Sequence, residues 1–131
     1  MIALDTNVLV RFLVEDDAKQ SRRAAALIER CAAEGEAMFL SDIVLVETCW
    51  VLERAYGFSR SEISGVLRAL STARQMAFCS SDRFSRALRA YEKGRAGFAD
   101  YMVFEQAKES GCARVATFDK VLLKEPGFVS P

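Results

Sequence analysis

The chain contains no histidine, and none of its four cysteines stands in a C-x-x-C pair. Zinc sites use closely spaced cysteine and histidine ligands, so this composition argues against zinc. The lack of an imidazole base also excludes the usual arrangements of serine and cysteine hydrolases. Carboxylates are therefore the groups left for acid–base chemistry or metal binding. We interpret the cysteines as small apolar core residues kept reduced in the cytosol: Cys31, Cys49, Cys79 and Cys112.

Long apolar runs and an excess of basic charge are also absent. No run approaches the roughly 18 apolar residues that cross a bilayer. Asp5 interrupts the N-terminal segment before a signal-peptide core forms, so we expect a cytoplasmic protein. Lysine plus arginine and aspartate plus glutamate balance at 18 each, unlike the composition of a strong nucleic-acid binder. Any contact with nucleic acid must therefore be local.

The remaining composition is typical of one globular domain. With 131 residues, 51% of them hydrophobic, the chain is expected to form a single domain spanning residues 1–131. Short apolar runs alternate with helical patterns, and these runs predict strands at 2–4, 37–40, 76–79, 114–117 and 128–129. This alternation predicts an α/β fold, with a parallel sheet covered by helices on both sides.

Capping residues delimit the predicted helices. The first helix follows Asp5 directly, because apolar positions recur there at helical spacing. The expected starts of the others are Asp16 or Asp17, Ser41, Ser59 in a capping box with Glu62, Ser81 or Asp82, and a position near Phe98. The expected helix ends lie at Gly35, Gly57 and Gly111. No repeat or linker interrupts the pattern.

Four acidic residues fall at positions suited to a common site. Asp5 ends the first predicted strand, and Asp119 follows the strand at 114–117. Ligands bind beyond the carboxyl ends of parallel strands, so both side chains are expected at that rim of the sheet. Asp100 falls in the first turn of its helix, and Glu47 lies one to two turns into another. We therefore expect four carboxylates to converge.

Each of these acids also has a structural interpretation. Asp5 alone would satisfy backbone N–H groups after a strand, Asp100 would complement a helix dipole, and Asp119 would be a turn residue. Glu47 is harder to explain in this way, because its helix is apolar nearly all round. A buried carboxylate without a partner costs several kcal/mol, so a cationic group should face it.

Four motifs carry a resemblance: Leu4-Asp5-Thr6-Asn7-Val8-Leu9, Val46-Glu47, Ala99-Asp100-Tyr101 and Ala116-Thr117-Phe118-Asp119. In this order and at these separations they resemble the PIN-domain family and, within it, the VapC-type toxins of bacterial toxin–antitoxin pairs. Asp-Thr-Asn after an N-terminal strand is fairly specific, whereas the shorter motifs gain their weight from the order. The resemblance covers nearly the whole chain and implies a five-stranded parallel sheet.

The resemblance also implies a site and an activity. The residues that match the family's acidic metal site are Asp5, Glu47, Asp100 and Asp119, with Thr6, Asn7 and Thr117 as polar support, or else as plain turn and cap residues. Mg²⁺ or Mn²⁺ would suit these oxygens and would help water attack an RNA phosphodiester. The implied protein is an endoribonuclease, the toxin of a VapBC-type pair, forming a homodimer and bound by an antitoxin peptide. Many relatives carry a further acid just after the last motif, whereas Lys120, Val121 and Leu122 follow Asp119 here. The number of cations, one or two, is therefore open.

The sequence also offers candidate residues for contacts with RNA and with a second protein chain. Basic residues flanking the acids would contact phosphates as a local patch, or else belong to a solvated face: Arg11, Lys93, Arg95 and Lys120. Phe98 and Tyr101 would stack on a base or lie in the core. The early and middle helices hold more apolar side chains than a thin sheet needs, which predicts association through residues such as Phe12, Trp50, Leu52 and Phe58.

Other classes of protein use aspartates at the ends of parallel strands. A phosphoacceptor receiver needs an acidic pair near the N-terminus, whereas Asp5 stands alone there. A phosphatase D-x-D signature is missing, because Asn7 occupies its second acidic position. A housekeeping RNA-processing nuclease and an inactive PIN scaffold that binds a partner remain as alternatives to the toxin.

Overall fold

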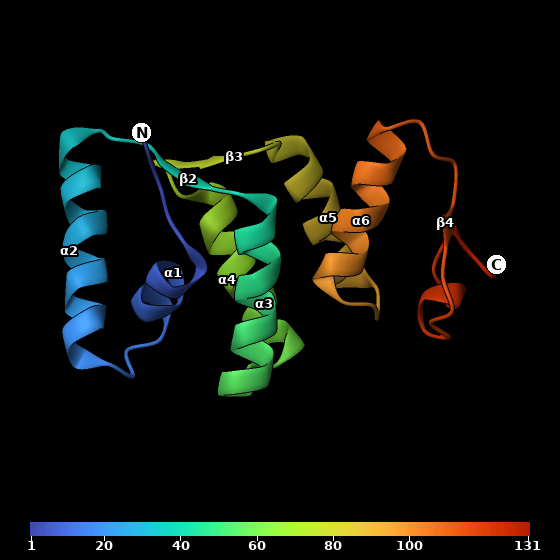
Figure 1. The fold of residues 1–131 in the computed structure, drawn as a ribbon, viewed down its shortest axis with the longest axis horizontal. Coiled ribbons are helices and arrows are strands. Elements are labelled where there is room, and N and C mark those ends of the chain that lie inside the picture. The colour runs from blue at the N-terminus through green and yellow to red at the C-terminus, as the bar shows by residue number, and fades with distance from the viewer. The chain divides into compact units, whose positions relative to one another are not determined.

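The computed structural model describes residues 1–131, which divide into an N-terminal unit, Met1–Cys79, and a C-terminal unit, Ser80–Pro131. The N-terminal unit contains β1 (Ile2–Ala3), α1 (Thr6–Leu13), α2 (Ala18–Glu34), β2 (Met38–Leu40), α3 (Asp42–Tyr56), α4 (Arg60–Thr72) and β3 (Met76–Phe78). The C-terminal unit contains α5 (Ser81–Lys93), α6 (Phe98–Glu109), β4 (Val115–Ala116), the 3₁₀ helix η1 (Leu122–Lys124) and β5 (Phe128–Val129). Figure 1 colours the elements from blue to red along the chain.

The three strands of the N-terminal unit form one parallel sheet in the order β1-β2-β3. Ile2 is in register with Met38, which is in register with Met76. Parallel neighbours need long crossovers, and here each crossover is a helix pair, α1–α2 or α3–α4. The carboxyl ends of β1 and β2 therefore lie at the same edge, where Asp5 and Ser41 cap the helices that follow.

Leucine side chains dominate the core of this unit. Helix α1 packs against both α2 and α3. The side chains that are completely shielded from solvent include Leu9, Leu40, Leu45 and Leu52. Burying each such side chain stabilises the fold by roughly 1.5–3 kcal/mol. The position of α1, and hence of the Asp-Thr-Asn motif at its start, is fixed by this packing.

The helix boundaries of this unit lie where the capping residues predict them. Asp17 caps α2 by accepting from the Gln20 N–H at 2.9 Å. Ser59 and Glu62 form the predicted capping box at the start of α4. Gly35 and Gly57 end α2 and α3 with φ of 67° and 66°, a left-handed conformation that glycine adopts without steric cost.

The C-terminal unit is built on the packing of α5 against α6. The Phe98 ring meets Phe84 and Tyr91 edge-on, at centroid distances of 5.9 and 6.1 Å. Arg86 Nε donates to the buried Glu105 carboxylate at 2.9 Å, which compensates that charge. Strands β4 and β5 pair in parallel, and η1 lies in the connection between them.

The predicted α/β class and the five short parallel strands are confirmed. The strands pair in two sheets, with three strands in the N-terminal unit and two in the C-terminal unit. A single domain across residues 1–131 stays a prediction. None of the helices combines the length and hydrophobicity that a membrane span requires.

Three local expectations need correction. Helix α5 is capped by Ser80 rather than Ser81 or Asp82, because Ser80 Oγ accepts from the Arg83 N–H at 3.1 Å. Helix η1 was not expected. Two cysteines are not core residues: Cys79 and Cys112 are exposed, since they lie in the connections after β3 and α6, whereas Cys31 and Cys49 are buried.

Candidate functional site

Asp5 lies at the junction of β1 and α1. Its Oδ1 accepts from the Thr6 N–H at 2.8 Å, and its backbone carbonyl accepts from Val8 and Leu9 in the first helical turn. The side chain is therefore the N-cap of α1 and remains exposed to solvent. Asp5 thus satisfies a backbone N–H group after the strand, as its structural interpretation expects. This contact leaves the carboxylate held at the rim of the sheet, where a ligand would reach it.

Thr6 connects Asp5 to Glu47 on α3. The buried Thr6 hydroxyl donates to Glu47 Oε2 at 3.2 Å, while the Thr6 backbone N–H donates to Asp5. One residue therefore orients two carboxylates that are 42 positions apart in sequence, from position 5 to position 47. The Asp-Thr sequence places both donors here because Thr6 is the first residue of α1.

The apolar sequence of its helix predicted that Glu47 is buried and faces a cationic group, and this prediction is wrong. The residue is exposed, and its hydrogen-bond partner is the Thr6 hydroxyl. The reason is the face of α3 on which it lies. Ile43 and Trp50, one turn before and after, are 69% and 45% exposed. The helix thus carries apolar side chains on its exposed face as well as on its core face.

Asp100 belongs to the first turn of α6 in the C-terminal unit. Its Oδ2 accepts from the Gly97 N–H at 3.0 Å. Burial raises the pKa of Asp100 above its usual range, the Gly97 hydrogen bond lowers it, and the negative charge of Asp119 raises it. The structure thus brings these two carboxylates within electrostatic reach of each other.

Asp119 is positioned by a tight turn after β4. Its Oδ1 accepts from the Val121 and Leu122 N–H groups at 2.8 and 3.3 Å, while its own N–H donates to Thr117 Oγ1 at 3.0 Å. The turn interpretation therefore holds, and the exposed carboxylate is fixed by the start of η1. Thr117 thus fixes the backbone of Asp119, and its role as polar support of a metal site stays a prediction.

A hydroxyl–carboxylate contact that the sequence did not reveal anchors the loop before Asp100. The Tyr101 hydroxyl donates to Glu125 Oε1 at 2.9 Å and accepts from the Ala96 N–H at 3.2 Å. A Cβ at Gly94 would collide with the Tyr101 hydroxyl. The only available signal was the pair of glycines, Gly94 and Gly97, in a loop next to Asp100. Tyr101 is thus a buried anchor rather than a stacking surface.

Phe98 is likewise buried in the core of the C-terminal unit. The predicted basic residues of this unit, Lys93, Arg95 and Lys120, are all exposed. Arg95 reaches the loop anchor through its backbone, whose N–H donates to Glu125 Oε1 at 3.0 Å. Their roles as phosphate contacts stay predictions.

Arg11 in the N-terminal unit is held by neighbours of its own. Its guanidinium donates to Asp16 at 2.9 Å, to the Tyr56 hydroxyl at 3.1 Å and to Gln20 Oε1 at 2.7 Å. The Tyr56 hydroxyl in turn donates to Asp16 at 2.6 Å. The charge of Arg11 is therefore compensated within the chain.

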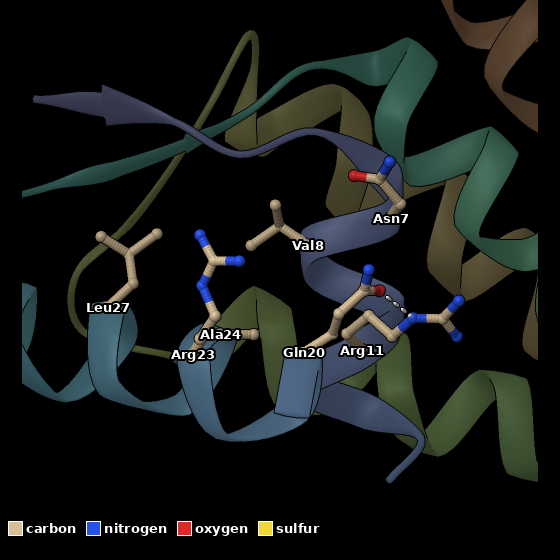
Figure 2. A pocket seen from close by; sticks show the side chains of 7 residues that line it. All are labelled: Asn7, Val8, Arg11, Gln20, Arg23, Ala24 and Leu27. Atoms are coloured by element: carbon tan, nitrogen blue, oxygen red, sulfur yellow. Dashed lines mark hydrogen bonds between the residues drawn. The ribbon is translucent and has the colours of Figure 1, made fainter. Parts of the chain in front are cut away.

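A cavity of about 370 Å³ lies beside α1 and α2 (Figure 2). It is lined by Asn7, Val8, Arg11, Gln20, Arg23, Ala24 and Leu27. Asn7 thus faces this cavity from the first turn of α1, two residues after Asp5. Sequence reasoning found neither the cavity nor Arg23, because both depend on how the two helices pack.

The acids come in pairs, Asp5 with Glu47 and Asp100 with Asp119. No group of three or more acidic, cysteine or histidine side chains comes together in a geometry suited to a metal ion. The donor chemistry nevertheless fits a hard divalent cation, because all donors are carboxylate oxygens. The raised pKa of Asp100 beside Asp119 also marks negative charge that a cation would neutralise.

Comparison with known proteins places the chain in a family, since a model of the PIN domain matches residues 2–128. The chain belongs to the PIN-domain family. A protein of Aquifex aeolicus (strain VF5) named VapC ribonuclease is 27% identical over 128 residues, covering 98% of this chain and 93% of that protein. The crystal structure of Mycobacterium tuberculosis VapC20, titled a sarcin-ricin loop cleaving toxin, matches with 22% identity and a TM-score of 0.43 over 100% of both chains. The resemblance to PIN-domain and VapC-type proteins is therefore confirmed.

Proposed function

We propose that this PIN-domain protein is an endoribonuclease that depends on Mg²⁺ or Mn²⁺ and acts as the toxin of a VapBC-type pair. The observation that carries the proposal is the arrangement of the acids. Each of the four motif carboxylates accepts a hydrogen bond at a strand end or within the first two turns of a helix. The similarity to the Aquifex aeolicus VapC ribonuclease along almost the whole chain supports the same activity.

The proposed cation ligands are the four motif carboxylates, Asp5, Glu47, Asp100 and Asp119. A bound Mg²⁺ or Mn²⁺ would supply Lewis-acid activation of water and neutralise charge on the phosphodiester. The chain's own residues prepare the ligands for this. Thr6 orients Glu47 through its hydroxyl, and it restrains Asp5 through its backbone N–H. Rigid support of this kind lowers the cost of assembling a charged site.

The Asp100 and Asp119 pair adds a driving force for metal binding. The negative charge of Asp119 raises the pKa of Asp100, so the pair stores electrostatic repulsion that a cation relieves. Thr117 fixes the backbone of Asp119, and Gly97 holds one oxygen of Asp100. Asn7 is assigned a supporting role from its place in the motif.

Partners follow from the same proposal. The substrate is RNA, and the expected protein partners are a second copy of the chain and an antitoxin. A housekeeping RNA-processing nuclease is the alternative with the same chemistry. An inactive scaffold is disfavoured, because all four acidic side chains are present. A neighbouring gene for a short DNA-binding antitoxin would favour the toxin.

Cleavage of single-stranded RNA tests the proposal. The purified protein should cleave RNA with Mg²⁺ or Mn²⁺ present. Cleavage should stop when EDTA is in excess, because EDTA removes the cation through which the carboxylates are proposed to act. Asp5→Asn should lose activity. Glu29→Gln, which changes an exposed carboxylate on α2 outside the site, is the matched control and should retain it. Undiminished cleavage in excess EDTA would refute the metal-dependent mechanism.

A further inference from the structure

The cavity beside α1 and α2 has the lining of a small polar ligand site. Its volume of about 370 Å³ falls within the range of pockets that hold small molecules. Val8, Ala24 and Leu27 form an apolar surface, and Asn7 and Gln20 contribute amides beside it. Such a combination suits a flat ring with polar edges.

Arg23 is the cation of this cavity. It forms no hydrogen bond or ion pair within the chain, whereas Arg11 on the facing helix is paired with Asp16. Figure 2 shows the Arg23 guanidinium between the side chains of Leu27 and Val8, and the Arg11 guanidinium directed away from them. The cavity thus holds one uncompensated positive charge next to apolar carbon.

These groups match the parts of a nucleotide. A guanidinium fork binds phosphate oxygens through two parallel hydrogen bonds. The Gln20 Oε1 is occupied by Arg11, which leaves its amide N–H groups as donors for a base edge. The apolar wall contacts the face of the base. An acidic peptide would use the guanidinium but would leave this wall and the amides without a partner.

We propose that this cavity is a nucleotide-binding subsite, in which Arg23 holds a phosphate of the RNA strand while a base lies against Val8 and Leu27. This rests on the proposed ribonuclease function. The connection to it is short, because Asn7 lines the cavity and lies two residues after the proposed ligand Asp5 on the same helical turn. RNA held here would extend from the acidic site along α1.

Binding of 2′-O-methyl RNA of random sequence, measured by fluorescence anisotropy in EDTA, tests the subsite without cleavage or metal. Arg23→Ala should weaken binding about tenfold, the loss expected for one phosphate contact made by two hydrogen bonds. Arg22→Ala removes the neighbouring exposed arginine, which does not line the cavity, and should leave binding within about twofold. Arg23→Lys should recover part of the loss, because it keeps the charge and loses the fork.

A second experiment, by NMR, locates the site at which nucleotides bind. Nucleoside monophosphates should shift the side-chain amide NMR signals of Asn7 and Gln20 in the wild type, and should do so less in Arg23→Ala. Equal RNA affinities of Arg23→Ala and Arg22→Ala would overturn the subsite. Shifts produced by polyglutamate but not by nucleotides would also overturn it, in favour of a peptide site. RNA binding through Arg23 without any Mg²⁺-dependent cleavage of natural RNA would uphold the subsite and refute the proposed function.

Discussion

At the scale of single residues, the surroundings of Asp100 raise its pKa above the ordinary value. Asp100→Asn should stabilise the metal-free protein at neutral pH by up to about 1 kcal/mol. The amide oxygen can still accept from Gly97, but the charge disfavoured by burial and by Asp119 is gone. Chemical denaturation in EDTA measures the change, with Glu29→Gln as the control. A less stable Asp100→Asn would mark Asp100 as a structural cap.

The difference between wild type and Asp100→Asn should also depend on pH. The native pKa of Asp100 is raised above its ordinary value of 3.8, so the folded protein binds this proton more tightly than the unfolded chain. The resulting stabilisation is complete below that ordinary value and is lost as pH rises through the raised pKa. The two proteins should therefore differ least in acid and most after Asp100 ionises. A difference independent of pH in this range would contradict the assigned cause.

The four acids were chosen as candidate ligands from sequence, and that role stays a prediction. Their structural surroundings were predictable only in part. Besides its ligand interpretation, Asp5 was given one as an acceptor for backbone N–H groups, and Asp119 was given one as a turn residue. One carboxylate oxygen of each does accept from backbone N–H groups. Glu47 was wrongly expected to be buried. A helix with apolar residues on both faces does not reveal which face meets solvent, and Ile43 and Trp50 lie on the exposed one.

At the scale of elements, the loop before α6 depends on one glycine. Gly94→Ala should destabilise the protein by about 1–3 kcal/mol, because the added Cβ overlaps the Tyr101 hydroxyl. Gly65→Ala, in the middle of α4, is the matched control. It has open space around it and should be neutral or stabilising by up to about 1 kcal/mol. Thermal melts of both variants measure this effect. Equal melting temperatures would contradict the prediction, because they would mean that the Tyr101 side chain moves aside without a loss of stability.

Local sequence signals predicted the helices and the strands but not the cavity. The caps at Asp17, Ser41 and Ser59 are local signals, and the structure places them as expected. At Ser80 three consecutive capping residues made the start ambiguous by one position. Strands β4 and β5 have two residues each and carry little periodicity. The cavity that Arg23 lines depends on the packing of two helices, which no local pattern encodes.

At the scale of the whole molecule, exposed apolar side chains favour association. Ile43, Trp50 and Phe12 are 69%, 45% and 37% exposed, whereas Leu52, also expected to contribute, is completely buried. We predict that the protein is not a lone monomer, because removing exposed apolar side chains from water lowers the free energy of the assembly. Light scattering at micromolar concentration measures the mass in solution. A strict monomer would refute the homodimer.

The central claim is that the acids of a PIN-domain chain hold a divalent cation, and the effect of Mg²⁺ on the melting temperature tests it most directly. Wild type and the Glu29→Gln control should melt higher when Mg²⁺ is added, since the cation binds the folded state. Asp100→Asn should hardly respond, and its RNA cleavage should fall at least about a hundredfold. If Asp100→Asn keeps the full Mg²⁺ response and its activity, the acidic site is misassigned.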